Sequence, residues 1–218
     1  RDLEDRGYRF FSAGDAEVVL KAYHAWGTEC LERFNGMFAF AVWERDSGRV
    51  VLARDRAGVR PLYYARMPHA LYFCSHLPAL LGVDGVDTSI DTTALHHYLT
   101  FHAVVPFPRT ILTGIEKVPP ASVMVIESDG STDIRTYWSL SYGGSPEDAE
   151  RDEAEWEQSV LDTLRRSVKR RLVADVPVGV LLSGGLDSSL IVGLLAEAGQ
   201  DHLATYSIGF EGVNEEKG

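Results

Sequence analysis

The chain has 218 residues, 45% of them hydrophobic, and a formal net charge of −11. This size and composition allow one large or two modest domains with a real core, and the acidic balance argues against a nucleic-acid partner, whose binding face would be basic. No apolar stretch approaches the ~18–20 residues of a membrane span and no signal peptide is visible, so we expect a cytoplasmic protein without a membrane partner.

Residues 1–140 have the pattern of an α+β region with mostly antiparallel strands. Apolar residues recur at close to helical spacing from Asp15 to Phe34, which predicts a helix. Two strand pairs follow, each joined by a turn, and a later hairpin surrounds Asp129-Gly130. In chain order, we expect strands at 37–44, 49–55, 61–65 and 70–75, short helices at 77–81 and 92–101, and hairpin strands at 122–127 and 133–138.

Residues 141–155 contain Gly143-Gly144-Ser145-Pro146 and then an acidic stretch, a composition typical of a linker. From Trp156 to Val173, apolar residues at helical spacing predict a long amphipathic helix. Basic residues gather toward its end, where they suit the helix dipole and form a solvated face; they are Arg165, Arg166, Lys169, Arg170 and Arg171.

The remaining residues predict a strand at 178–182, a loop, a helix at 190–198 and a second strand at 203–208. This order is a βαβ unit of a parallel sheet, whose ligand site lies at the carboxyl ends of the strands. Two architectures in one chain predict two domains, at 1–140 and 156–218.

The strongest functional signal is the loop at 183–189, which reads Ser-Gly-Gly-Leu-Asp-Ser-Ser between the strand and the helix. Its glycines allow a phosphate to approach the backbone, and the helix amino terminus favours an anion. Its hydroxyls add donors, and Asp187 is placed to hold Mg²⁺ against the phosphates. The alternative is an ordinary strand-to-helix turn, since serine, aspartate and glycine are common in turns and caps.

Other phosphate motifs do not fit this loop. No Gly-Lys-Ser or Gly-Lys-Thr follows at the spacing of a Walker loop, and the dinucleotide pattern Gly-x-Gly-x-x-Gly is absent. The loop instead resembles that of ATP pyrophosphatases, which split ATP between the α- and β-phosphates and adenylate a carboxylate or carbonyl oxygen.

The few thiols and imidazoles do not suggest a metal site. Cys30 and Cys74 belong to no ligand-spaced set, so we expect reduced, buried or half-buried thiols. His96, His97 and His102 are one, five and six residues apart, a spacing that is wrong for two zinc ligands on one helical face.

Three strings together resemble the glutamine-dependent asparagine synthetase family. They are Asn-Gly-Met-Phe-Ala-Phe at 35–40, Arg-Asp-Arg-x-Gly-x-x-Pro-Leu-Tyr-Tyr at 54–64, and the pyrophosphate loop. The resemblance covers nearly the whole chain. It implies a partial α+β glutaminase domain of the N-terminal nucleophile hydrolase type, with antiparallel sheets layered with helices. The start of a Rossmann-like α/β ATP pyrophosphatase domain then follows.

The resemblance implies a ligase with two chemistries. In the first, an N-terminal cysteine hydrolyses glutamine to release ammonia; in the second, ATP with Mg²⁺ adenylates a carboxylate, which ammonia then amidates, as in the conversion of aspartate to asparagine. Its partners would be these small molecules, and a homodimer is left open. Alternatives are another pyrophosphate-loop ligase without a glutaminase half, which the strings at 35–40 and 54–64 argue against, and a non-catalytic nucleotide-binding paralogue.

Site residues follow from the resemblance position by position. Asp15 matches the acid that holds the α-amino group of glutamine, although a helix N-cap is an equally good role for it. Arg54 and Asp55 match a signature that we interpret as a structural ion pair rather than as catalytic residues. At the adenine, the matching positions are Leu182 and Ile208, for which core packing is the alternative role. At the phosphates, the matching positions are Ser183, Gly184, Gly185, Asp187 and Ser188. Asp187 also matches the position that holds Mg²⁺.

The chain departs from the family in two ways. It opens at Arg1, inside the glutaminase domain, so we expect no catalytic residue in this chain; neither Cys30 nor Cys74 has the free α-amino group that the mechanism needs. His76 stands where most members carry an acid.

The acceptor is a separate question, because the pyrophosphate loop fits any carboxylate. The strings at 97–106 and 207–218 resemble a branch that amidates a dipeptide, the N-acetylglutaminylglutamine amide synthetases. From this resemblance we expect the full-length protein to prefer an acylated glutaminyl dipeptide to free aspartate, with aspartate as the acceptor of ordinary asparagine synthesis as the alternative.

Overall fold

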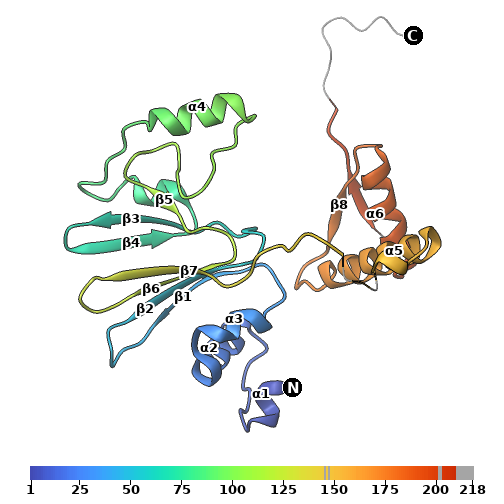
Figure 1. The fold of residues 1–218 in the computed structure, drawn as a ribbon, viewed down its shortest axis with the longest axis horizontal. Helices are drawn as coiled ribbons and strands as arrows, with labels where there is room; N and C mark the ends of the chain where they lie inside the picture. The colour runs from blue at the N-terminus through green and yellow to red at the C-terminus, as the bar shows by residue number, and fades with distance from the viewer. Residues whose placement is uncertain (145, 147, 201–202, 210–218) are drawn as a thin grey trace, which may run out of the picture. The chain divides into compact units, whose positions relative to one another are not determined.

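The computed structural model describes residues 1–144, 146, 148–200 and 203–209. The chain divides into two compact units, Arg1–Ser141 and Tyr142–Gly218 (Figure 1). Positions 145 and 147 of the expected linker, and 210–218 of the string that favours a dipeptide, lie outside the described residues.

The first unit begins with helices. Helix α1 (Asp2–Asp5) precedes α2 (Asp15–Trp26), and a 3₁₀ turn, η1 (Gly27–Glu29), leads into α3 (Cys30–Arg33). The single helix expected from Asp15 to Phe34 is therefore wrong in one respect. It breaks at Gly27, whose φ of 56° leaves the helical region while its amide closes the last turn onto Tyr23.

Two antiparallel sheets follow. The four-stranded sheet has the order β1-β2-β6-β7, and the three-stranded sheet has the order β4-β3-β5. Their strands are β1 (Ala39–Trp43), β2 (Val50–Arg54), β3 (Tyr63–Met67), β4 (Ala70–Cys74), β5 (Glu116–Lys117), β6 (Ser122–Ile126) and β7 (Thr132–Thr136). The expected hairpins are confirmed, whereas the two-residue β5 is too short for any pattern to predict.

Two short helices lie between β4 and β5 in the chain. They are η2 (Leu77–Leu80), which is 3₁₀ rather than α-helical, and α4 (Thr92–Thr100). The Asp91 carboxylate caps α4 by accepting the amides of Thr93 and Ala94.

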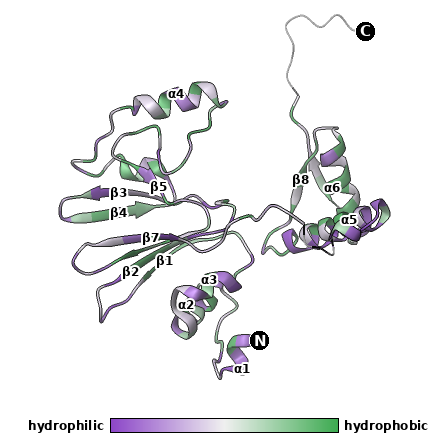
Figure 2. Ribbon diagram, in the orientation of Figure 1, coloured by the Kyte–Doolittle hydropathy of each residue, from purple (hydrophilic) through white to green (hydrophobic). Residues whose placement is uncertain are grey.

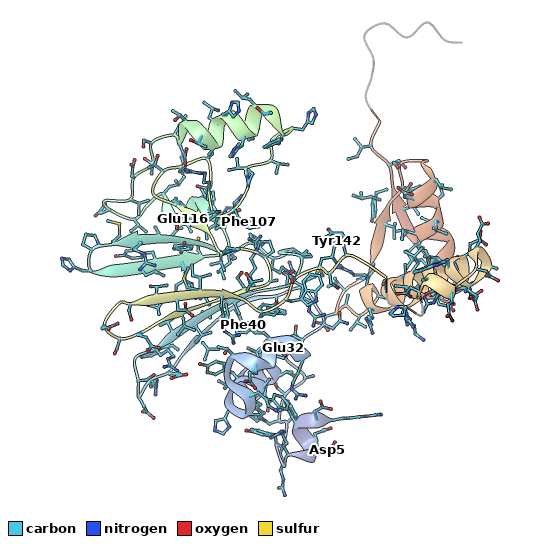
Figure 3. All side chains as sticks on the ribbon, in the orientation of Figure 1. Asp5, Glu32, Phe40, Phe107, Glu116 and Tyr142 are labelled. Atoms are coloured by element: carbon cyan, nitrogen blue, oxygen red, sulfur yellow. The ribbon has the colours of Figure 1, made fainter. Side chains whose placement is uncertain are left out.

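The unit is layered as helices, sheet and sheet (Figures 1 and 2). Strand β2 lies at the centre and is buried on both faces: Val51 packs in the cluster with α2 and α3, and Leu52 packs against Leu62 and Met124. Phe40 of β1 joins the helix-side cluster (Figure 3). The expected α+β fold with antiparallel sheets layered with helices is confirmed.

The second unit is built around a parallel pair. It contains α5 (Glu153–Arg171), β8 (Gly179–Leu181), α6 (Leu186–Glu197) and β9 (Ala204–Tyr206), and β8 pairs in parallel with β9. Val168 of α5 packs against Leu194 and Leu195 of α6. The expected βαβ unit is confirmed.

Both long helices of this unit begin earlier than the apolar spacing indicates. Helix α5 begins at Glu153 because Asp152 and Glu155 form a capping box. Helix α6 begins directly after the glycines, so Asp187, Ser188 and Ser189 form its first turn. No helix in the described part of the chain combines the length and apolarity that a bilayer crossing needs.

Candidate functional site

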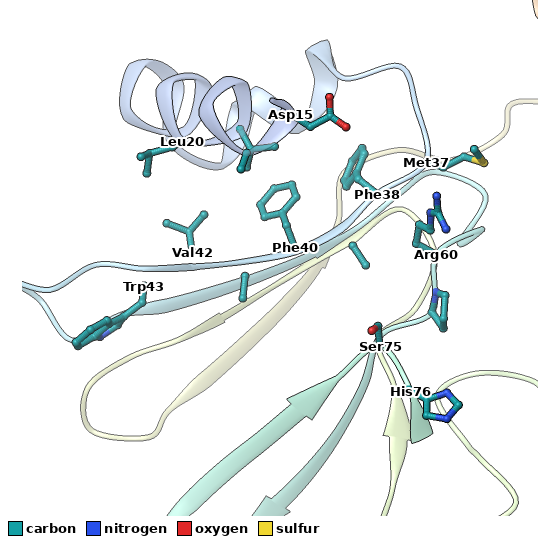
Figure 4. A pocket seen from close by; sticks show the side chains of 15 residues that line it. Asp15, Leu20, Met37, Phe38, Phe40, Val42, Trp43, Arg60, Ser75 and His76 are labelled. Atoms are coloured by element: carbon teal, nitrogen blue, oxygen red, sulfur yellow. The ribbon is translucent and has the colours of Figure 1, made fainter. Parts of the chain in front are cut away.

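An open groove of about 870 Å³ lies between α2 and the edge strand β1 of the first unit (Figure 4). One end is polar, with the Asp15 carboxylate at the start of α2 and the Arg60 guanidinium from the loop before β3. Ser75 and His76, directly after β4, belong to the same end. The rest is lined by apolar side chains: Val19, Leu20, Phe38, Phe40, Val42 and Trp43.

Asp15 does not cap α2. The N-cap is Gly14, and no side chain caps the helix. The carboxylate of Asp15 is exposed at the groove, so the alternative role as a helix cap is wrong. Asp15 remains a candidate for holding a cationic group at this end.

Glu17, one turn into α2, holds the preceding segment instead. Its carboxylate is buried and accepts the amides of Phe11 and Ser12, at 3.1 and 2.8 Å, and the Ser12 hydroxyl at 2.6 Å. Lys21 forms an ion pair with it. Burial opposes the charge, but these hydrogen bonds outweigh it and lower the pKa of Glu17 from 4.5 to about 2. An ionised Glu17 thus fixes the chain just before Asp15.

Arg54 and Asp55 shape the loop that carries Arg60. Arg54 donates to the carbonyls of Gly58 and Arg60, at 2.7 and 2.8 Å, and to Val118 at 2.6 Å. The Asp55 carboxylate accepts the amides of Ala57, Val59 and Arg60 at 3.1, 3.0 and 2.9 Å. The structural role is confirmed, but the expected ion pair is wrong. Each side chain binds backbone instead, because a tight loop leaves many main-chain groups to satisfy.

Gly58 is required in this loop. Its φ is +63°, and a Cβ there would lie 2.9 Å from Pro120 and 3.2 Å from the Arg54 guanidinium. A larger residue would therefore displace the side chain that holds Arg60.

The two thiols differ in setting, as expected. Cys30 of α3 is fully buried, and burial raises the pKa of its thiol to about 11, so it stays protonated. Cys74 ends β4, is half-buried, and its sulfur lies 3.1 Å from the His76 carbonyl. Neither thiol is among the residues that line the groove.

In the second unit, the loop at 183–189 is a compact turn at the amino end of α6. Gly184 has a φ of +79°, which makes the turn, and Gly185 is the N-cap without a side-chain cap bond. The Ser183 amide donates to the Ser188 hydroxyl at 3.3 Å, and the two hydroxyls are 3.1 Å apart. The first-turn amides and the helix dipole therefore face solvent without a side-chain acceptor, a good setting for an anion.

Leu182 and Ile208 flank this loop at the carboxyl ends of β8 and β9. Leu182 is half-buried, whereas Ile208 is 77% exposed. Plain core packing, the alternative for both residues, is therefore wrong for Ile208. An exposed isoleucine beside a phosphate-type loop suits a flat apolar ligand surface.

Asp187 lies in the first turn of α6, and its side chain is exposed. Among the residues that the structure describes, no group of three or more His, Cys, Asp or Glu side chains is arranged to hold a metal. A single carboxylate fits Mg²⁺ that is mainly held by phosphate oxygens and water, since this ion is usually bound through one or two carboxylates plus substrate phosphates.

The sequence did not single out Arg60 and Ser75 as groove residues. Arg60 lies inside the string at 54–64, and its place in that string is the sequence feature that could have pointed to it. Ser75 carries no pattern of its own, because only the pairing of β3 with β4 brings it beside Arg60.

Comparisons with known families divide the chain in two. Residues 1–138 match the glutamine amidotransferase domain, and residues 159–218 match asparagine synthase. The first match covers more than half of the chain.

Curated relatives match over almost the whole chain. Asparagine synthetase [glutamine-hydrolyzing] 1 of Bacillus subtilis is 37% identical over 96% of this chain and 32% of its own length. Asparagine synthetase [glutamine-hydrolyzing] 3 of the same organism is 33% identical over 97% of this chain and 34% of its own length. A putative asparagine synthetase of Methanocaldococcus jannaschii is 35% identical over 93% of this chain and 39% of its own length. The chain thus spans about a third of the length of these relatives.

Among solved structures, the glutamine phosphoribosylpyrophosphate amidotransferase of Bacillus subtilis covers 94% of this chain and 41% of its own, with 16% identity and a TM-score of 0.42.

Proposed function

Because the chain belongs to the glutamine amidotransferase domain family and continues into an asparagine synthase domain, we propose that the protein is a glutamine-hydrolysing ligase of the asparagine synthetase type. Glutamine supplies ammonia, ATP adenylates a carboxylate, and ammonia displaces AMP to leave an amide. The relatives' names favour aspartate as the acceptor and asparagine as the product. We assign residues 1–140 to the glutaminase domain, 141–155 to a linker and 156–218 to the start of the synthetase domain.

The observation that carries this proposal is the uncapped amino terminus of α6 behind its double-glycine turn. The loop would bind the β- and γ-phosphates of ATP through the backbone amides of Ser183, Gly184, Gly185 and Ser188 and through the hydroxyls of the two serines. Leu182 and Ile208 would pack against the adenine. Binding the leaving pyrophosphate more tightly as its charge develops is what would accelerate adenylation.

Mg²⁺, when bound, would neutralise charge on the phosphates, and Asp187 would hold it there. The carboxylate has no competing ion pair among the described residues, so it is free to take this role.

In the groove, Asp15 would accept hydrogen bonds from the α-ammonium group of glutamine. The apolar wall formed by Phe38 and Phe40 would exclude water beside it, which strengthens that charge pairing.

Two variants of the complete gene product, one in each site, test the proposal. We expect Asp15→Asn to reduce glutamine-driven amide formation about 10- to 100-fold, the effect of losing a hydrogen bond to a charged group. Activity driven by added ammonia should remain, because the carboxylate serves only the glutamine site. We expect Asp187→Asn to abolish acceptor-dependent AMP formation with either nitrogen source.

The matched control is Asp162→Asn, which changes an exposed aspartate on α5 of the same unit. It should leave both activities within about twofold of wild type. Normal AMP formation by Asp187→Asn would refute the loop assignment. Equal losses of the two activities in Asp15→Asn would refute the glutamine role, and a wild-type protein that binds nucleotide without forming AMP would support the non-catalytic paralogue.

A further inference from the structure

The parallel ladder of β8 and β9 ends irregularly beside the phosphate loop. The register pairs Leu181 with Tyr206, so Leu182 stands opposite Ser207. The Leu182 amide donates to the Tyr206 carbonyl at 2.8 Å, which continues the ladder by one bond. The Leu182 carbonyl then accepts from the Ser207 hydroxyl at 2.6 Å.

A side chain here takes the place of a backbone donor. In a parallel ladder every second residue of one strand donates to the residue before its partner and accepts from the residue after it, and the Leu182–Tyr206 bond makes Leu182 such a residue. The carbonyl of Leu182 would thus accept from the amide of Ile208. The Ser207 hydroxyl satisfies that carbonyl instead, and β9 ends at Tyr206.

The bond lies next to the residues that matter for ATP. Leu182 is the last residue before the loop, and the loop's own hydrogen bonds begin at Ser183. The Leu182 amide is bound by the last residue of β9, Tyr206, and its carbonyl by the next residue, Ser207, so both backbone polar groups of Leu182 are held. The loop begins directly after this residue, whose amide and carbonyl are both bound.

We propose that Ser207 is a positioning residue for the adenylating site. Its hydroxyl fixes the Leu182 carbonyl, aims the loop amides at the phosphates, and keeps the Ile208 amide out of the ladder so that Ile208 stays exposed at the adenine side. The inference rests on the proposed function, because it assigns the loop to ATP. Ser207 itself touches no reacting atom.

A positioning role differs from a purely structural one in what its loss changes. Without the hydroxyl, the Ile208 amide can pair with the Leu182 carbonyl, which extends the ladder and draws Ile208 toward the sheet. The Leu182 carbonyl then still accepts a hydrogen bond, so the free energy of unfolding changes little. The geometry for MgATP is what changes, and we expect this as a higher KM for ATP.

The test is the dependence of AMP formation on MgATP in the complete gene product, with ammonia and the acceptor saturating. We expect Ser207→Ala to raise the KM for ATP about three- to tenfold, the range for one neutral hydrogen bond, while kcat stays within about twofold. Ser207→Thr retains the hydroxyl and should restore a KM near the wild-type value. The matched control is Ser167→Ala, because Ser167 also donates its hydroxyl to a backbone carbonyl, that of Thr163 at 2.8 Å, within α5.

Two results would overturn the inference. The first is that Ser207→Ala and Ser167→Ala have the same KM for ATP. The second is that Ser207→Ala and Ser207→Thr both have a raised KM for ATP and a lower thermal midpoint of unfolding. Failure of the proposed function looks different. A wild-type protein that forms no AMP overturns that function and this inference together, whereas an active wild type with a normal Ser207→Ala overturns the inference alone.

Discussion

At the scale of single residues, the carboxylate of Glu17 organises the polar end of the groove. It is ionised, buried and bound by two amides, a hydroxyl and Lys21, while Asp15 next to it is left exposed. One acid thus holds the backbone, and the other is free for a ligand. The two are only two residues apart, and spacing alone does not distinguish them.

The lowered pKa of Glu17 gives a pH dependence with a definite sign. The pKa is about 2 in the folded state and 4.5 in an unfolded chain, so the group favours folding above pH 4.5. This contribution is lost as the pH falls from 4.5 toward 2. We expect Glu17→Gln to lower the free energy of unfolding at neutral pH, with a difference from wild type that shrinks over that window, measured by urea unfolding at a series of pH values.

An exposed glutamate provides the control for this series. Glu32→Gln should give a difference from wild type that is small and flat with pH, since the Glu32 side chain is exposed. A Glu17→Gln difference that grew on acidification would contradict the assigned direction of the pKa shift.

At the scale of elements, α5 depends on its first turn. Asp152 accepts the Glu155 amide at 2.9 Å, and Glu155 accepts the Asp152 amide at 3.1 Å. We expect Asp152→Ala to destabilise the start of α5 by about 1 kcal/mol, the usual cost of losing such a cap. The amides of Glu155 and Trp156 should then exchange with solvent about fivefold faster in hydrogen-exchange measurements.

Glu157→Ala is the control for the capping prediction, because Glu157 is exposed on the same helix and alanine favours the helical state. Its exchange rates should equal those of wild type or fall below them. Unchanged exchange in Asp152→Ala would contradict a role of this cap in stabilising the start of α5.

At the scale of the whole molecule, the proposed function is defined by which carboxylate is amidated. The phosphate loop recognises a feature common to all acceptors, so discrimination must come from groups that pair with the rest of the acceptor. The relatives' names lead us to expect that aspartate alone supports ATP–pyrophosphate exchange in the complete gene product, and that asparagine accumulates when ammonia is added. Exchange only with an acylated glutaminyl dipeptide would favour the other branch.

The sequence by itself determined what depends on local order. Helical spacing in α2 and α5, the hairpins of β1–β2, β3–β4 and β6–β7, and the double-glycine loop before α6 are all properties of short windows. Neighbours along the chain decide periodicity, turns and caps, so these features can be read without knowing the fold. The family strings at 35–40 and 54–64 are local in the same sense.

The tertiary structure alone decided which distant residues meet. The pairing of β2 with β6, about seventy residues further along, buries β2 on both faces, and the pairing of β3 with β4 brings Ser75 beside Arg60. Arg54 binds backbone rather than Asp55, and Ser207 replaces a backbone donor to Leu182, because each side chain takes the partner that the fold brings within reach. Hydrogen bonds depend on distance and angle, not on separation along the chain, so only folding could fix these partners.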